Sequence, residues 1–67
     1  MKTYLLQSPR DYVDADIPKG YMLQVISSRT GNRPDMTEVR DALHRAGFGN
    51  RADSYASPGN WIVKELL

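Results

Sequence analysis

The sequence of 67 residues predicts a small α+β domain in which one helix packs on one face of a three- or four-stranded, mainly antiparallel sheet. Three observations lead to this fold class. One segment carries a complete set of helix signals, three segments are rich in strand-forming residues, and the length suits a single domain spanning residues 1–67. The expected order is β-β-α-β, or β-β-α-β-β if residues 53–57 add a short strand. One helix can cover only one face of such a sheet.

The first two strands are expected at residues 1–8 and 21–28. Pro9 ends the first strand, because proline cannot donate a hydrogen bond to a ladder. In the second strand the side chains alternate between two faces: Tyr21, Leu23 and Val25 on one, Met22, Gln24 and Ile26 on the other. Since the second face is only partly polar, either this strand is central or its second face meets another chain.

The helix is predicted from Asp35 to Ala46. Asp35 and Glu38 have the spacing of a capping box, in which each side chain accepts a backbone N–H of the other residue. Apolar residues then recur at helical spacing: Val39, Ala42, Leu43 and Ala46. Gly47 stands where a left-handed residue ends a helix, and Phe48 can make the apolar contact that accompanies such an end.

The last third of the chain is expected to hold a turn followed by a strand. Pro58-Gly59 has the residue types of a type II turn, and the residues from Trp61 to Val63 begin a strand. Residues 10–20, 29–34 and 49–53 are predicted loops. The predicted core brings together residues from three of these elements: Leu23, Val25, Val39, Leu43 and Val63.

Composition excludes several classes of site. The chain has no cysteine and one histidine, so disulfides, thiolate metal sites and histidine-rich zinc sites are excluded. Nine basic and eight acidic residues give a net charge of +1, whereas dedicated nucleic-acid binders have a stronger basic excess. No apolar run approaches the ~20 residues that span a bilayer, and the N-terminus lacks the apolar core of a signal peptide. We expect a cytoplasmic protein with no membrane partner, metal or cofactor.

No group of residues has the pattern of a catalytic site. His44 lies on the predicted helix beside Arg40 and Arg45, and no serine stands in a nucleophile-elbow pattern. The acidic residues of the segment 11–16 lack the later bidentate glutamate of a calcium loop. Gly47-Phe48-Gly49 follows a helix instead of preceding one, which suits a helix end and not a dinucleotide site. The sequence therefore predicts neither an enzyme nor a small-molecule substrate.

The leading functional hypothesis is a protein-interaction module that self-associates through its sheet. Its strands carry more apolar residues than one face needs, and contiguous exposed apolar surface marks partner sites. The interface residues expected on this basis are Tyr4, Met22, Ile26 and Trp61. In the competing hypothesis the segment 10–20 covers that face with Tyr12, Val13 and Ile17 and leaves a monomer.

The alternative function is an accessory nucleic-acid or anion-binding domain. A strand-to-helix loop directs backbone N–H groups and the positive end of the helix at an anion. The candidate contacts are in that loop and on the helix: Arg29, Thr30, Gly31, Asn32, Arg33 and Arg40. Asp35 and Glu38 oppose this function, because their negative charge lies in the first turn of the helix.

Overall fold

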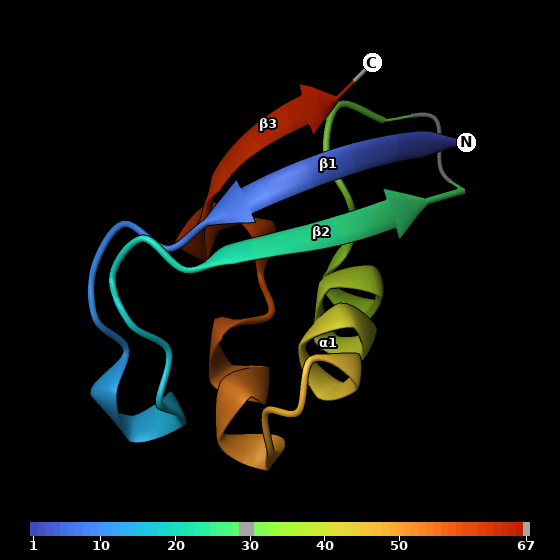
Figure 1. The fold of residues 1–67 in the computed structure, drawn as a ribbon. Coiled ribbons are helices and arrows are strands. Elements are labelled where there is room, and N and C mark those ends of the chain that lie inside the picture. The colour runs from blue at the N-terminus through green and yellow to red at the C-terminus, as the bar shows by residue number, and fades with distance from the viewer. Residues whose placement is uncertain (29–30, 67) are drawn as a thin grey trace.

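The computed structural model describes residues 1–28 and 31–66. Four elements form its frame (Figure 1): β1 (Lys2–Gln7), β2 (Met22–Ser27), α1 (Met36–Arg45) and β3 (Ile62–Leu66). Short 3₁₀ helices fill the connections at Val13–Ala15, Asn50–Tyr55 and Pro58–Asn60. The fold is the predicted α+β class with three strands, and residues 53–57 form no fourth strand.

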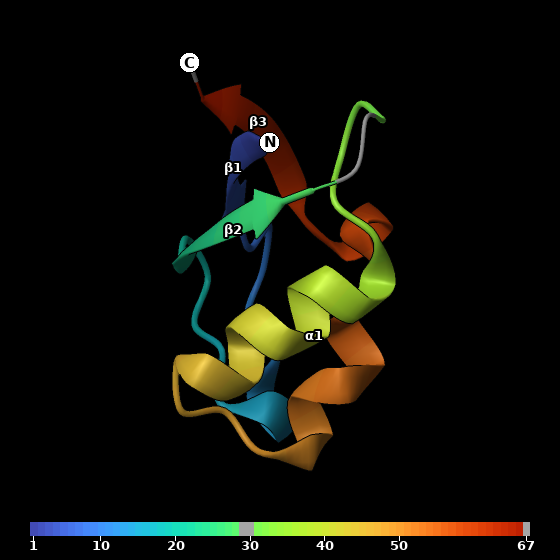
Figure 2. The same cartoon turned by 90° about the vertical axis from the view of Figure 1, so that its right-hand side faces the viewer.

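The sheet has the order β2-β1-β3, with β1 antiparallel to both neighbours. β2 and β3 therefore run parallel to each other on opposite sides of β1, and the chain crosses from one edge to the other through α1. β2 is an edge strand, so the alternative in which the strand at residues 21–28 is central is wrong. Figures 1 and 2 show that α1 and the 3₁₀ segments all lie on one side of the sheet.

The side chains of β2 alternate as the sequence predicts. Leu23, Val25 and Ser27 are buried on the face that meets α1, whereas Met22, Gln24 and Ile26 are exposed on the other. The predicted core is also confirmed. Leu23, Val25, Val39 and Leu43 are buried in one cluster, and Val63 is partly buried against it.

Both ends of α1 confirm the sequence signals. Glu38 donates its backbone N–H to the Asp35 carboxylate at 2.9 Å, and Asp35 donates its own to the Glu38 carboxylate at 3.1 Å. At the other end, Gly47 donates to the His44 carbonyl at 3.0 Å and Phe48 to the Leu43 carbonyl at 3.1 Å. This bond pair is a Schellman motif, and it places Gly47 at a φ of +101°.

Gly47→Val should destabilise the domain by about 1 kcal/mol or more, because a β-branched residue resists positive φ. Nothing lies within 4 Å of a Cβ built on Gly47, so the cost comes from the backbone and not from a clash. Gly49→Ala is the matched control, since Gly49 has equally open surroundings and a φ of −86°. Urea melts of the two variants measure the difference. Equal stabilities would contradict the role of Gly47.

The predicted type II turn at Pro58-Gly59 is wrong. Pro58–Asn60 is a 3₁₀ turn, with Asn60 donating to the Ser57 carbonyl at 3.0 Å and Trp61 to the Pro58 carbonyl at 3.1 Å. Two successive bonds of this kind require helical backbone angles at consecutive residues, and Gly59 does not adopt the positive φ of a type II turn.

Candidate functional site

The candidate site is the face of the sheet that points away from α1, which we call the open face. The strand register places nine side chains there in three rows of three. The rows, written in the order β2, β1, β3, are Ile26, Thr3, Leu66; Gln24, Leu5, Lys64; and Met22, Gln7, Ile62. Among the described residues no helix lies over this face (Figures 1 and 2).

Apolar side chains at the corners of the open face are unusually exposed. Met22, Ile26 and Ile62 are 51%, 54% and 55% exposed. Lys64 is the one charged residue of the nine, although a quarter of the whole sequence is charged. Depletion of charge is a property of the cores of protein interfaces. The open face shares this low content of charged residues with interface cores, and it also contains the polar residues Thr3, Gln7 and Gln24.

Two of the four interface residues expected from the sequence are on this face, namely Met22 and Ile26. The other two expectations are wrong, since Tyr4 and Trp61 are only 0% and 6% exposed. Tyr4 points from the central strand into the core, where its hydroxyl donates to the Gly31 carbonyl at 2.9 Å. Trp61 donates its indole N–H to the Tyr55 carbonyl at 2.6 Å. Buried aromatic side chains with satisfied polar groups belong to the core.

Sequence reasoning missed three apolar residues of the open face as interface residues, namely Leu5, Ile62 and Leu66. The signal that could have found them is the period of two along each strand, applied from Tyr4 and Val63 as inward-facing residues. The three consecutive apolar residues Tyr4, Leu5 and Leu6 obscure that period.

The segment 10–20 does not cover the open face, contrary to the competing hypothesis. Tyr12 and Ile17 are buried in the core on the α1 side, and Val13 is 81% exposed. The Tyr12 ring stacks on Tyr55 with centroids 4.0 Å apart and meets Trp61 edge-on at 6.2 Å. This aromatic contact holds the segment 10–20 on the side of the sheet that faces α1.

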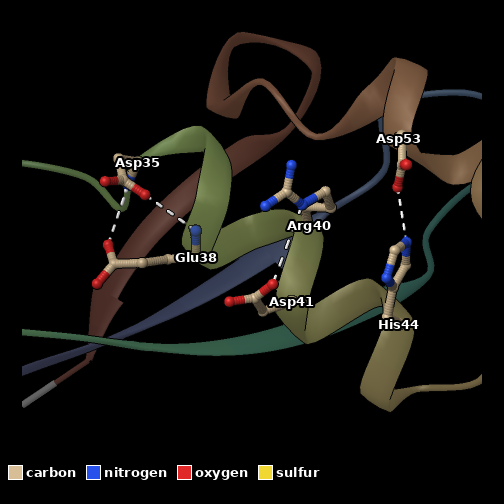
Figure 3. Close-up of polar contacts among 6 residues, drawn as sticks. All are labelled: Asp35, Glu38, Arg40, Asp41, His44 and Asp53. Carbon is tan, nitrogen blue, oxygen red and sulfur yellow. Dashed lines mark hydrogen bonds and ion pairs between the residues drawn. The ribbon is translucent and has the colours of Figure 1, made fainter.

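The anion site predicted at the start of the helix is occupied by a carboxylate of the protein itself, that of Glu38. Glu38 accepts hydrogen bonds from the Ser27 hydroxyl at 2.7 Å, the Ser28 N–H at 3.2 Å and the Asp35 N–H at 3.1 Å. Figure 3 shows its side chain turned back toward Asp35 at the start of α1. Glu38 therefore occupies the position where donors would hold an external anion.

The candidate anion-binding residues that the structure describes, Gly31, Asn32, Arg33 and Arg40, are not assembled around a pocket. Arg29 and Thr30 lie outside the described residues. Gly31, Asn32 and Arg33 are exposed, and the Gly31 carbonyl accepts a bond at 3.2 Å from Lys2 in addition to that from Tyr4. Arg40 is exposed on the outer side of α1, 4.0 Å from the carboxylate of Asp41.

The Glu38 carboxyl has a pKa below its ordinary value of 4.5. Burial raises this pKa, but the hydrogen bonds from Ser27, Asp35 and Ser28 favour the charged form and together outweigh burial. A carboxylate with a lowered pKa stabilises the fold fully above its ordinary pKa. The contribution is lost as pH falls through the lower, folded-state pKa.

We predict that acid destabilises the wild type more than Glu38→Gln. As pH falls from neutral through the ordinary pKa of 4.5 and then through the lower folded-state pKa, the wild type should lose the additional stability of the charged cap. The glutamine variant starts less stable at neutral pH and has no charge to lose at this position. Urea melts across this range measure both slopes, and parallel curves would contradict the role of the carboxylate.

His44 contacts the carboxylate of Asp53, a partner that its sequence neighbours Arg40 and Arg45 did not indicate. Its Nε2 lies 2.6 Å from Asp53 Oδ1, and both side chains are about 40% exposed (Figure 3). The pair joins α1 to the 3₁₀ helix Asn50–Tyr55 at the surface. This exposed contact links the two elements through one hydrogen bond.

Among residues 1–28 and 31–66, no group of three or more His, Cys, Asp or Glu side chains is placed to hold a metal ion. No helix there has the length and apolar character needed to cross a membrane. Comparison of the chain with protein-family models, curated proteins and solved structures finds no significant match.

Proposed function

We propose that this chain is a non-catalytic protein-interaction module that self-associates by stacking the open faces of two copies. The observation that carries the proposal is the composition of the open face. It combines exposed apolar corners with a single charge, and no described helix covers it.

The register makes the open face complementary to itself. A two-fold axis that runs parallel to β1 and lies between two facing sheets would set β2 of one copy over β3 of the other. Met22 then meets Ile62, Ile26 meets Leu66, and Gln24 meets Lys64. The central side chain, Leu5, meets its own equivalent. Apolar residues thus contact apolar residues, and each lysine faces an amide and not the second lysine.

The expected dimer is weak. Strands about 4.8 Å apart that rise about 3.3 Å per residue make a three-stranded face of roughly 14 by 17 Å. This is roughly 240 Å² per copy, less than the usual area of a specific interface, so the contact should be transient. We expect monomer and dimer to exchange, with the dimer accumulating toward millimolar concentration. Association would also supplement the small core that a chain of this length can build.

Ile26→Lys tests the proposal. Ile26 is more than half exposed, so the variant should fold with a change in stability within about 0.5 kcal/mol. It should nevertheless sediment as a single chain, because lysine would be buried between the sheets of a dimer. Sedimentation equilibrium over a range of concentrations measures the association.

The matched control is Val13→Lys, which adds the same charge at an exposed residue outside the open face. This variant should associate like the wild type. A wild type that stays one chain at millimolar concentration would contradict self-association. Equal loss of association in both variants would show that net charge, and not the open face, controls it.

A further inference from the structure

A groove runs along the free edge of β2, between this strand and α1. It encloses about 690 Å³ and is lined on one side by Met22, Gln24 and Ile26 and on the other by Ala42, Arg45 and Ala46. The helix contributes mainly small side chains, so the groove is wide beside the strand. The groove shares Met22, Gln24 and Ile26 with the open face and adds to them the free edge of β2 and the small side chains of α1.

The edge of β2 offers an unpaired row of backbone groups. Ser8 donates its backbone N–H to the Tyr21 carbonyl at 3.0 Å. In the alternating ladder, the β2 residues that bond to β1 are therefore Leu23, Val25 and Ser27. Because the ladder alternates, the N–H and C=O groups of Met22, Gln24 and Ile26 point away from β1. β2 has no charged residue and no proline that would block strand addition. The other edge strand, β3, contains Lys64 and Glu65.

The shape of the groove suits an extended segment that has no helix of its own packed beside it. Figures 1 and 2 both draw α1 alongside β2, the strand farthest from β3. A second β2 would bring its own α1 to the same side of the joint sheet. Adjacent strands lie about 4.8 Å apart, whereas packed helix axes need about 8–10 Å. Antiparallel pairing of two β2 edges would therefore crowd the two helices on one side of the joint sheet, whereas a strand that carries no helix would not.

Charge sets the direction and chemistry of the occupant. The start of α1 is tied to the Ser27 end of β2 by Glu38, and Phe48, just after α1, packs edge-on against Tyr21. Arg45 therefore lies at the Tyr21 end of the groove, and it makes no ion pair with a described residue. A segment antiparallel to β2 would bring its C-terminal side to Arg45.

We propose that this groove binds an extended peptide segment of another protein by adding it as a strand antiparallel to β2. The segment has small apolar side chains at alternate positions and an acidic side chain near its C-terminal end, where Arg45 pairs with it. Main-chain bonds to Met22, Gln24 and Ile26 hold the segment, and Ala42 and Ala46 contact its side chains. This is the strand-addition mode of peptide recognition.

Titration with two synthetic peptides, followed by ¹⁵N NMR, tests the proposal. Both are eight residues of alternating threonine and valine, acetylated and amidated, and their last two residues are changed to aspartates in one and lysines in the other. Amide signals of Met22, Gln24, Ile26 and Ala46 should shift, while that of Ile62 stays in place. The aspartate peptide should bind about two- to fivefold more tightly, as expected for an exposed ion pair.

Three variants sharpen the test. Arg45→Glu should reverse the preference between the peptides, and Ala46→Trp should fill the groove and abolish the shifts in β2. Arg40→Glu, which changes the same charge outside the groove, should leave both results unchanged. The proposal is overturned if millimolar peptide leaves the β2 amide signals unshifted. It is also overturned if the wild-type protein binds both peptides with equal affinity. Shifts confined to the residues around Ile62 and Leu5 would also overturn it, since the peptide would then lie on the open face.

Discussion

Replacing Leu43 with alanine is expected to leave the domain largely unfolded at 25 °C. Leu43 is fully buried in the cluster that joins α1 to the sheet, and α1 is the one α-helix among the described residues. Truncating a buried leucine to alanine costs about 2–5 kcal/mol, because the cavity left behind collapses only in part. A domain of this size rarely has more than roughly 3–5 kcal/mol of stability. The substitution therefore removes most or all of it.

The measurement is an NMR spectrum of Leu43→Ala without denaturant, together with a urea melt. Met36→Ala is the matched control on the same helix, since Met36 is 58% exposed and its truncation should cost within about 0.5 kcal/mol. Well-dispersed signals and a melt close to that of the wild type for Leu43→Ala would show that α1 does not contribute the core of this fold.

Trp61→Ala should destabilise the domain by about 3–5 kcal/mol and abolish folding in the same way. Trp61 packs edge-on against Tyr12 and donates its indole N–H to the Tyr55 carbonyl. It thereby joins the segment 10–20 and the 3₁₀ helix Asn50–Tyr55 to the start of β3. Its loss leaves a cavity and removes a hydrogen bond between segments that are distant in sequence.

Ile62→Ala is the control for this substitution, because Ile62 is the next residue and is 55% exposed on the open face. It should retain the fold and weaken self-association. The comparison separates the interface role that the sequence predicted for Trp61 from the core position that the structure gives it. A folded Trp61→Ala that fails to associate would return this residue to the interface, whereas an unfolded variant places it in the core.

The elements whose signals are local could be predicted from the sequence. The start of α1 at Asp35 and its end at Gly47 depend on residues within a few positions of each other, and both follow the predicted bonds. The two faces of β2 follow from strict alternation between apolar core residues and residues such as Gln24. The exposure of Met22 and Ile26 could be predicted for the same reason.

The features that depend on distant parts of the chain could not be predicted. In β1, Tyr4, Leu5 and Leu6 are all apolar, so only the position of α1 decides that Tyr4 and Leu6 point inward and Leu5 outward. The burial of Trp61 depends on Tyr12, 49 positions earlier in the chain. The order of the strands follows from the crossover through α1, which no local pattern encodes.

The central claim, that the open face is the surface through which two copies associate, is tested most directly by a dilution series of the wild-type protein followed by ¹⁵N NMR. On dilution from about 1 mM to about 20 µM, a range that spans weak association, the signals that shift should cluster on the open face. Leu5, Met22, Ile26 and Ile62 should move, and the exposed side of α1 around Arg40 and Asp41 should not. Signals that are unchanged on dilution, or shifts centred on α1, would contradict the claim.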